Sequence, residues 1–120
     1  MILPFFALHG TDEDQAALEV STTLAVVLVN LEQMDEAVPL LRHVLDVRIG
    51  ILGPDDPETM STLHLLASVL ARAEQFDEAR LLARSLVERR INMLGEGHPK
   101  TAEAREFLAT IESLGDSSPD

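Results

Sequence analysis

The residues of this 120-residue chain that most resemble a chemical motif lie at positions 95–101, with the sequence Gly-Glu-Gly-His-Pro-Lys-Thr. A glycine-rich loop that ends in Gly-Lys-Thr can hold phosphate groups through its backbone N–H groups and its lysine. Here Pro99 stands where such a loop needs glycine, and no strand is predicted before it. The related segment 52–59 contains no lysine. We therefore interpret both segments as turns that cap a helix.

Four histidines could bind a metal or carry a proton: His9, His43, His64 and His98. They show neither the i, i+4 pairing nor the ligand spacing of zinc sites, so no metal site is predicted. We expect His9 and His98 to lie in loops and His43 on the outer surface of its helix. His64 is expected to face a groove, either as a group that titrates or donates a hydrogen bond, or as an ordinary polar surface residue.

Adjacent acidic residues occur at positions 35–36 and 77–78. Neighbouring side chains point in different directions from a helix, so neither pair can serve as an acid and a base on one substrate. Negative charge at the start of a helix complements its dipole, which explains both pairs. The chain has no cysteine, and its serines, threonines and histidines do not combine at nucleophile spacing. We therefore predict no catalytic residue, no cofactor and no enzymatic activity.

An internal repeat of forty-two residues indicates the elements that position these residues. Leu-Gly-Pro-Asp-Asp-Pro-Glu-Thr at 52–59 returns at 94–101 as Leu-Gly-Glu-Gly-His-Pro-Lys-Thr. Met-Asp-Glu-Ala at 34–37 corresponds in the same frame to Phe-Asp-Glu-Ala at 76–79. A fixed period of about 20–50 residues indicates supersecondary units that must stack to bury their apolar faces.

The apolar residues recur at helical spacing along almost the whole chain. We predict an all-α fold, an α–α superhelix of antiparallel helix pairs, with helices near 13–31, 34–51, 57–73, 76–93 and 99–114. The stripe of the first helix expected to face the core consists of Leu18, Leu24, Val27, Leu28 and Leu31.

Proline, glycine and acidic residues mark the helix ends. Asp56 is a natural N-cap before Pro57, and proline is tolerated at the first helical position. Gly53 and Gly95 follow apolar stripes, where a left-handed residue commonly closes a helix. The predicted organisation is a remnant of a preceding repeat or N-terminal cap at 1–12, repeats over 13–114 (13–56, 57–98 and a partial or capping helix at 99–114) and a disordered tail at 115–120.

The composition favours a globular domain and excludes several classes of partner. Hydrophobic residues make up 46% and aromatic residues 3%, so the core must be built from aliphatic side chains. The formal net charge of −12 repels nucleic acid and anionic membranes, so neither is expected as a partner. No window reaches the length of a membrane span, and the start lacks the features of a signal peptide. Together with the absence of cysteine, this favours a cytoplasmic location.

These spaced motifs resemble tetratricopeptide repeats, in particular the long variety of the same period found in kinesin light chains and related bacterial proteins. The resemblance covers about residues 13–114. It implies that Ala25 and Ala67 occupy the small position where the first helix of a repeat touches its partner. It also implies that Ala37 and Ala79 occupy the matching small position early in the second helix. Such repeats typically bind protein segments.

One departure from that family concerns the grip on a peptide. The family's first helix often carries Leu-Asn-Asn-Leu-Ala, whose asparagines can hold the backbone of an extended peptide. The equivalent segments 21–25, 63–67 and 105–109 contain no asparagine, and Asn30 is the only asparagine expected on the groove side.

The concave face formed by the first helices is the remaining candidate site. Arg72 is the one cation expected on this small, apolar and acidic lining, which favours a partner segment with basic and small apolar side chains. The residues expected to line it are Glu19, Thr22, Val26, Val29, Asn30, Ser61, His64, Ser68, Ala71, Arg72, Glu103, Glu106 and Thr110.

Two functions remain open from the sequence. The first is a non-catalytic protein–protein interaction module or scaffold that binds a peptide or protein segment on this face. The second is a self-associating structural fragment of a larger multidomain regulator, which forms homo-oligomers through exposed array ends. Phe5, Phe6 and Leu8 would supply an apolar patch at one such end.

Overall fold

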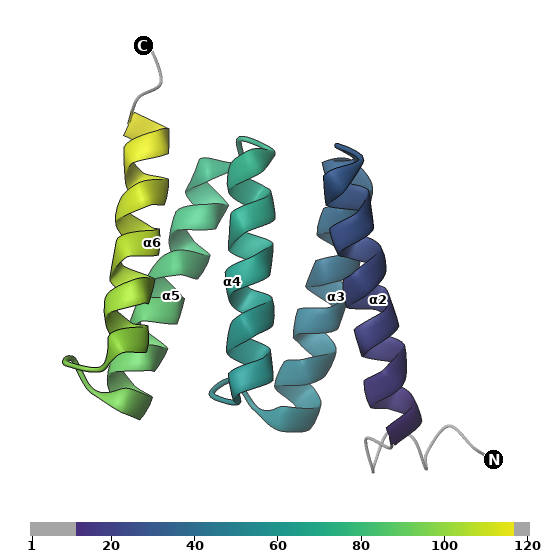
Figure 1. Cartoon of the computed structure of the whole chain (residues 1–120), viewed down its shortest axis with the longest axis horizontal. Coiled ribbons are helices and arrows are strands. Elements are labelled where there is room, and N and C mark those ends of the chain that lie inside the picture. The colour runs from purple at the N-terminus through teal and green to yellow at the C-terminus, as the bar shows by residue number, and fades with distance from the viewer. Residues whose placement is uncertain (1–11, 117–120) are drawn as a thin grey trace.

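The computed structural model describes residues 12–116, which are helical apart from short turns. Within this range the elements are α2 (Asp12–Asn30), α3 (Met34–Leu52), α4 (Pro57–Arg72), α5 (Phe76–Leu94) and α6 (Pro99–Asp116), with no strand between them (Figure 1). The predicted all-α fold is confirmed, and each predicted helix matches to within two residues at either end. Of the N-terminal remnant predicted at 1–12, only Asp12 is described, and it begins α2.

The start of α4 shows how the local sequence sets a helix end. Asp56 has an extended backbone, and its carboxylate accepts a hydrogen bond of 2.9 Å from the backbone N–H of Glu58. This bond satisfies one of the N–H groups that a helix leaves unpaired in its first turn. Pro57 at the first helical position needs no such partner. The predicted cap is confirmed.

The turns inside each helix pair are closed by a backbone conformation that was not predicted from the sequence. Glu32 and Glu74 both have a φ of 64°, the left-handed conformation that usually falls to glycine. The backbone N–H of Gln33 donates to the carbonyl of Leu28 at 2.8 Å, and that of Gln75 donates to the carbonyl of Leu70 at 2.8 Å. Both turns are therefore Schellman closures with a non-glycine residue at the left-handed position.

The two glycines predicted to close α3 and α5 take a different conformation. Gly53 and Gly95 have a φ of 93°, with ψ of 159° and 161°. This combination is accessible essentially to glycine alone, but it is extended rather than left-handed helical. These glycines stop the helix and redirect the chain toward the next one.

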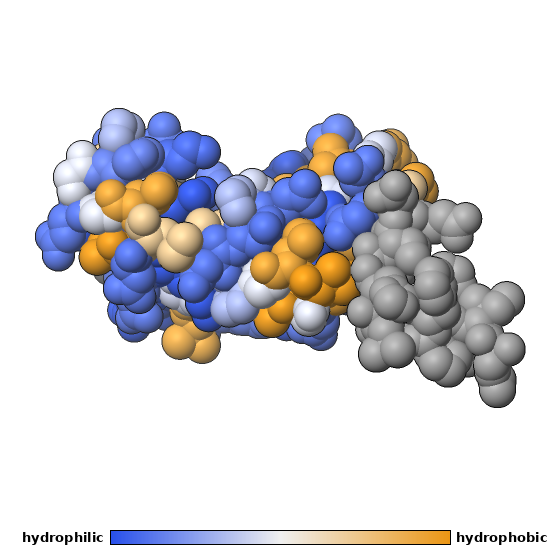
Figure 2. Space-filling model, turned by 90° about the horizontal axis from the view of Figure 1, so that it is seen from below, coloured by the Kyte–Doolittle hydropathy of each residue, from blue (hydrophilic) through white to orange (hydrophobic). Residues whose placement is uncertain are grey.

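Consecutive helices pack against one another as antiparallel neighbours. In Figure 1, α2, α4 and α6 form the front layer, with α3 and α5 behind them. Seen from below, the outline is indented at the top of the view, the side of the front layer (Figure 2). The array is thus hollowed on the face formed by the first helix of each pair.

Small and large apolar residues alternate in the core. Alanines at the contact between paired helices are almost completely buried, as the family resemblance implies, and they let the helix backbones approach: Ala25, Ala37, Ala67 and Ala79. The largest completely buried aliphatic side chains are Leu41, Leu66, Leu70, Leu86 and Ile111. Burial of each of these contributes roughly 1.5–3 kcal/mol to stability.

The core stripe predicted for α2 is wrong in part. Leu18 is buried and Leu28 is partly buried, but Leu24, Val27 and Leu31 are exposed. Helical spacing identifies the apolar side of α2 but not whether another helix covers it, and among the described elements α2 makes its main contacts with α3.

The end of α6 also differs from the prediction. The helix continues through Gly115 to Asp116, so these two residues are not part of a disordered tail as predicted; residues 117–120 lie outside the described residues. A side chain at position 115 would place its Cβ 3.4 Å from the Cβ of Phe76 and still closer to Arg80. Glycine therefore lets the last turn of α6 approach the start of α5.

Candidate functional site

The residues predicted to line the groove lie on α2, α4 and α6, and one of them, Glu19, also borders a hollow on the outer face of α2. With one exception they are at least partly exposed, which leaves them accessible to a partner. The exception is Val29, which is buried in the core cluster, so its assignment to the groove is wrong. Its position near the turn brings it against α3 rather than toward the open face.

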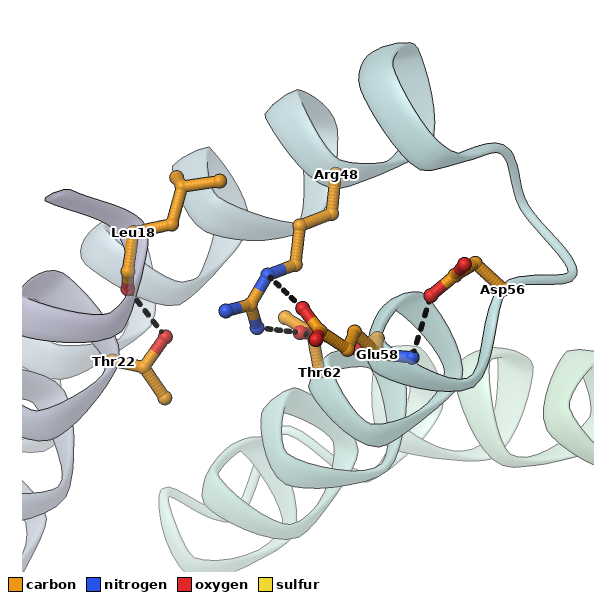
Figure 3. Close-up of polar contacts among 6 residues, drawn as sticks. All are labelled: Leu18, Thr22, Arg48, Asp56, Glu58 and Thr62. Atoms are coloured by element: carbon orange, nitrogen blue, oxygen red, sulfur yellow. Dashed lines mark hydrogen bonds and ion pairs between the residues drawn. The ribbon is translucent and has the colours of Figure 1, made fainter. Parts of the chain in front are cut away.

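Arg48 of α3 is buried and points between α2 and α4 (Figure 3). Its Nη1 donates a hydrogen bond of 2.7 Å to the hydroxyl of Thr62, and its Nε lies 3.9 Å from a carboxylate oxygen of Glu58. The Thr62 hydroxyl donates in turn to the backbone carbonyl of Glu58 at 2.9 Å. On the α2 side, the Thr22 hydroxyl donates to the carbonyl of Leu18 at 2.8 Å. Arg48 thus has a carboxylate at ion-pair distance and one hydrogen-bond acceptor, although its Nε makes no hydrogen bond.

The groove between α4 and α6 differs at the equivalent positions. Arg90 corresponds to Arg48 in the repeat frame, but Lys100 stands in place of Glu58 and Ala104 in place of Thr62. Neither partner of Arg48 is therefore repeated. Arg90 and Lys100 instead line one small hollow together with His64, Leu86, Glu103 and Ala104.

His64 lies midway along this second groove. Its ring centroid is 4.1 Å from that of Phe107 on α6, with the ring planes at 70°. Burial lowers the pKa of His64, the charge of Arg90 lowers it further, and Glu103 opposes the shift. The imidazole is therefore neutral at physiological pH and can both donate and accept hydrogen bonds.

The upper end of the α4–α6 groove is an apolar hollow of about 440 Å³. It is lined by Ser68, Ala71, Arg72, Glu74, Phe76, Phe107, Thr110, Ile111 and Leu114. Phe76 comes from the first residue of α5 and Phe107 from the middle of α6. A hollow of this size accepts an aliphatic or aromatic side chain, and Arg72 stands at its edge.

The basic residues that line the α4–α6 groove differ from the other basic residues in their ion pairs. Six arginines pair with carboxylates, as Arg42–Glu78, Arg48–Glu58, Arg80–Asp77, Arg84–Glu112, Arg89–Asp55 and Arg105–Glu96. Among side chains 15–115, Arg72, Arg90 and Lys100 have no such partner. All three lie along the α4–α6 groove. The prediction that Arg72 is the only cation of the concave face is therefore wrong, because Arg90 enters from the second helix of its pair.

The segment that resembled a phosphate loop is a helix cap. The backbone N–H of Lys100 donates to Nδ1 of His98 at 3.0 Å, and the Thr101 hydroxyl donates to the carbonyl of Gly95 at 2.8 Å. Both bonds close the turn onto the first residues of α6. Within the described residues, no group of three or more histidine and acidic side chains is placed to hold a metal ion. None of the described helices is long and apolar enough to cross a membrane.

Sequence reasoning missed the residues that arrive from the second helices. Arg48, Phe76 and Arg90 belong to α3 and α5, which were expected to form only the back layer. The available signal was the repeat frame itself, since position 48/90 is arginine in both copies while its neighbours on the following helix change from Glu and Thr to Lys and Ala.

The stacked antiparallel pairs and the hollowed face define a helical repeat protein with an open concave face. A family model described as tetratricopeptide repeat matches residues 14–92, more than half of the chain, so the chain belongs to the tetratricopeptide repeat family. These repeats generally mediate protein–protein interaction and are typically non-catalytic. A search of curated proteins found no match.

Proposed function

We propose that this chain is a non-catalytic interaction module whose α4–α6 groove binds an extended segment of a protein partner. The segment carries acidic side chains near its two ends and an apolar side chain between them. The observation that carries this proposal is the placement of Arg72, Arg90 and Lys100 on one groove, without ion pairs among the described side chains. Arg90 is half-buried, whereas Arg72 and Lys100 are exposed; each lacks a carboxylate that a partner could supply through a charge-assisted hydrogen bond.

The helix geometry sets the spacing of the two acidic groups. Lys100 is level with position 58 of α4 in the repeat frame, fourteen residues before Arg72. At about 1.5 Å per residue, the two cations are roughly 21 Å apart along the groove. An extended peptide rises about 3.3 Å per residue, so its acidic side chains would be about six or seven residues apart. The apolar side chain would enter the hollow beside Arg72.

The local charges favour an acidic segment over the basic one expected from the lining that the sequence predicted. The net charge of −12 is spread over the whole surface. Exposed charges farther apart than a Debye length, about 8–10 Å at physiological salt, are largely screened from one another. Contacts inside the groove therefore depend on the charges that line its hollows, where the three cations Arg72, Arg90 and Lys100 outnumber the two carboxylates of Glu74 and Glu103.

The proposal is tested with a fluorescein-labelled peptide of sequence Asp-Ser-Ser-Ser-Leu-Ser-Glu and its Lys-for-acid counterpart, measured by fluorescence polarisation. We expect binding of the acidic peptide only. Arg72→Glu should weaken it at least tenfold. The pair Lys100→Glu with Ala104→Thr, which copies the α2–α4 groove, should do the same while keeping the fold.

Two controls isolate the groove. Arg105→Glu makes the same change of charge on α6 but at a residue paired with Glu96 outside the groove, and Val26→Asp alters the α2–α4 groove. Both should leave the affinity within twofold. A preference for the basic peptide, or equal losses with Arg105→Glu, would refute the proposed site.

The finer family assignment is part of the same proposal. The forty-two-residue period supports repeats of the kinesin-light-chain type, with units at 13–56 and 57–98 and a capping helix at 99–114. Self-association through array ends is the competing function, and the exposed apolar residues of α2 are the observation that favours it. Sedimentation as a monomer at high concentration would remove it.

A further inference from the structure

The outer face of α2 is an apolar surface that no described helix covers. Val20 is 68% exposed, Leu24 49% and Val27 45%. This face has a shallow hollow of about 570 Å³, which is lined by Ala16, Glu19, Val20, Thr23, Leu24 and Val27. Exposed apolar area of this kind usually marks an interaction site.

The repeat frame identifies the residues of α4 that are equivalent to this face of α2. The equivalent residues of α4 are Thr62, Leu66 and Val69, which are 2%, 1% and 1% exposed. They are buried because α3 precedes α4 and packs against it. The face of α2 is thus shaped to receive the end of a helix in the place that α3 takes against α4.

The outer face of α6 is polar at positions where α4 is apolar. The α6 residues that correspond to the buried Leu63 and Leu70 of α4 are Arg105 and Glu112. A polar outer face is what terminal repeats use to end a stack in water. The apolar face of α2 has no such polar residues at Val20, Leu24 and Val27, which favours its contact with another segment.

We propose that residues 2–8 of this chain, which lie outside the described residues, dock on this face against Val20 and Leu24. In the repeat frame Phe6 corresponds to Arg48, and Ile2 and Leu3 correspond to the buried Val44 and Leu45 of α3.

The residue types change together at these positions. The polar set of Arg48, Thr62 and Glu58, joined by the contacts in Figure 3, corresponds to Phe6, Val20 and Ala16. An apolar set thus replaces a polar one on both sides of the contact. If Gly10 is instead aligned with Gly53, Phe5 takes the place of Phe6, and an aromatic residue still corresponds to Arg48.

The short connection favours the chain's own segment over a second copy. Three residues, 9–11, separate the segment from α2, and four residues, 53–56, separate α3 from α4. A short tether gives an effective concentration in the millimolar range, far above the protein concentration of a typical experiment.

Transplanting the polar set tests the contact in the full chain. One variant carries Phe6→Arg, a second carries Val20→Thr with Ala16→Glu, and a third combines all three substitutions; Phe5→Arg replaces Phe6→Arg in a parallel series. Melting is followed by circular dichroism. We expect the first two variants to melt roughly 4–8 °C lower and the combined variant of one series to recover at least half of the summed loss.

Three outcomes would overturn the proposal. Variants on α2 that melt like the wild type would show that the face is open. Losses that simply add in both series would show that the segment does not touch α2. Recovery that depends on protein concentration, or that arises when the separate variants are mixed, would assign the face to a second copy of the chain.

Discussion

Arg48 and Thr62 connect the first helix pair to the second, and substitutions at these two residues should have clearly different effects on the free energy of unfolding. Arg48 is 7% exposed, and Thr62 supplies the only hydrogen-bond acceptor for its Nη1 among the described contacts. Thr62→Val removes this acceptor and leaves a buried charged donor without a partner. Such a loss costs about 1–3 kcal/mol of the free energy of unfolding.

Substitution of the other partner, Arg48, should cost less stability. Arg48→Met removes the buried charge, while Thr62 keeps its bond to the carbonyl of Glu58 and the exposed Glu58 carboxylate stays solvated. We expect a cost of at most about 1 kcal/mol. The double variant replaces both partners by apolar groups, which is commonly neutral or stabilising. It should therefore be at least about 1 kcal/mol more stable than the sum of the two single losses predicts.

Urea unfolding followed by far-ultraviolet circular dichroism measures these differences, since the chain has no tryptophan or tyrosine to report by fluorescence. With a slope of about 1–3 kcal/mol per molar urea, a loss of about 2 kcal/mol moves the midpoint by roughly 1 M. Thr22→Val is the matched control, because Thr22 bonds only the carbonyl of Leu18 in its own helix. It should cost no more than about 0.5 kcal/mol, the usual range of substitutions away from a buried partner.

The reasoning fails if the double variant is as unstable as the sum of the single variants. Arg48 would then stabilise the fold through its packing rather than through its bond to Thr62. It also fails if Thr22→Val costs as much as Thr62→Val, because loss of the hydroxyl's intrahelical bond would then explain both.

Three further outcomes follow from local features. The hydroxyl of Thr59 is buried without a hydrogen-bond partner, whereas the hydroxyl of its counterpart Thr101 donates a hydrogen bond. In urea unfolding, Thr59→Val should therefore be neutral or stabilising, and Thr101→Val should lower the free energy of unfolding by about 1 kcal/mol. Glu74→Gly should raise the urea midpoint through up to about 1 kcal/mol of stability, because it relieves the left-handed backbone, and Glu74→Ala should not. The pKa of His64 lies below 6.5, so folding favours its neutral form. The contribution of His64 to stability is present above that pH and is lost as the pH falls through the lowered pKa. The wild type should therefore lose more stability than His64→Gln between pH 7 and 5, and an NMR-measured pKa of 6.5 or above would contradict this.

Much of the architecture was predictable because it depends on local chemistry. The helix limits follow from Asp56-Pro57 and from the glycines after each second helix, and the helix pairing follows from the short turns and the repeat frame. The buried alanines at the helix contacts were predicted from the family resemblance. Even so, the residues that close the turns, Glu32 and Glu74, could not be identified, because glutamate has no preference for a positive φ.

The candidate site was only half predictable from the sequence. Its α4 and α6 residues follow from helical periodicity, but Arg90 and Phe76 enter from α5, and their contribution depends on how deeply the second helices approach the concave face. The charge of the groove likewise depends on pairing. Arg48 and Arg90 are the same residue in the same register, yet only Arg48 meets a carboxylate.

The sequence by itself determined the helices, their limits, their order and the period that relates them. The tertiary structure alone decided which apolar faces are covered and which cations are free. Leu24 and Leu66 show this most directly, since the same residue at the same repeat position is exposed in α2 and buried in α4. The physical reason is that helix formation depends on neighbours within a few residues, whereas burial and ion pairing depend on which helix packs alongside.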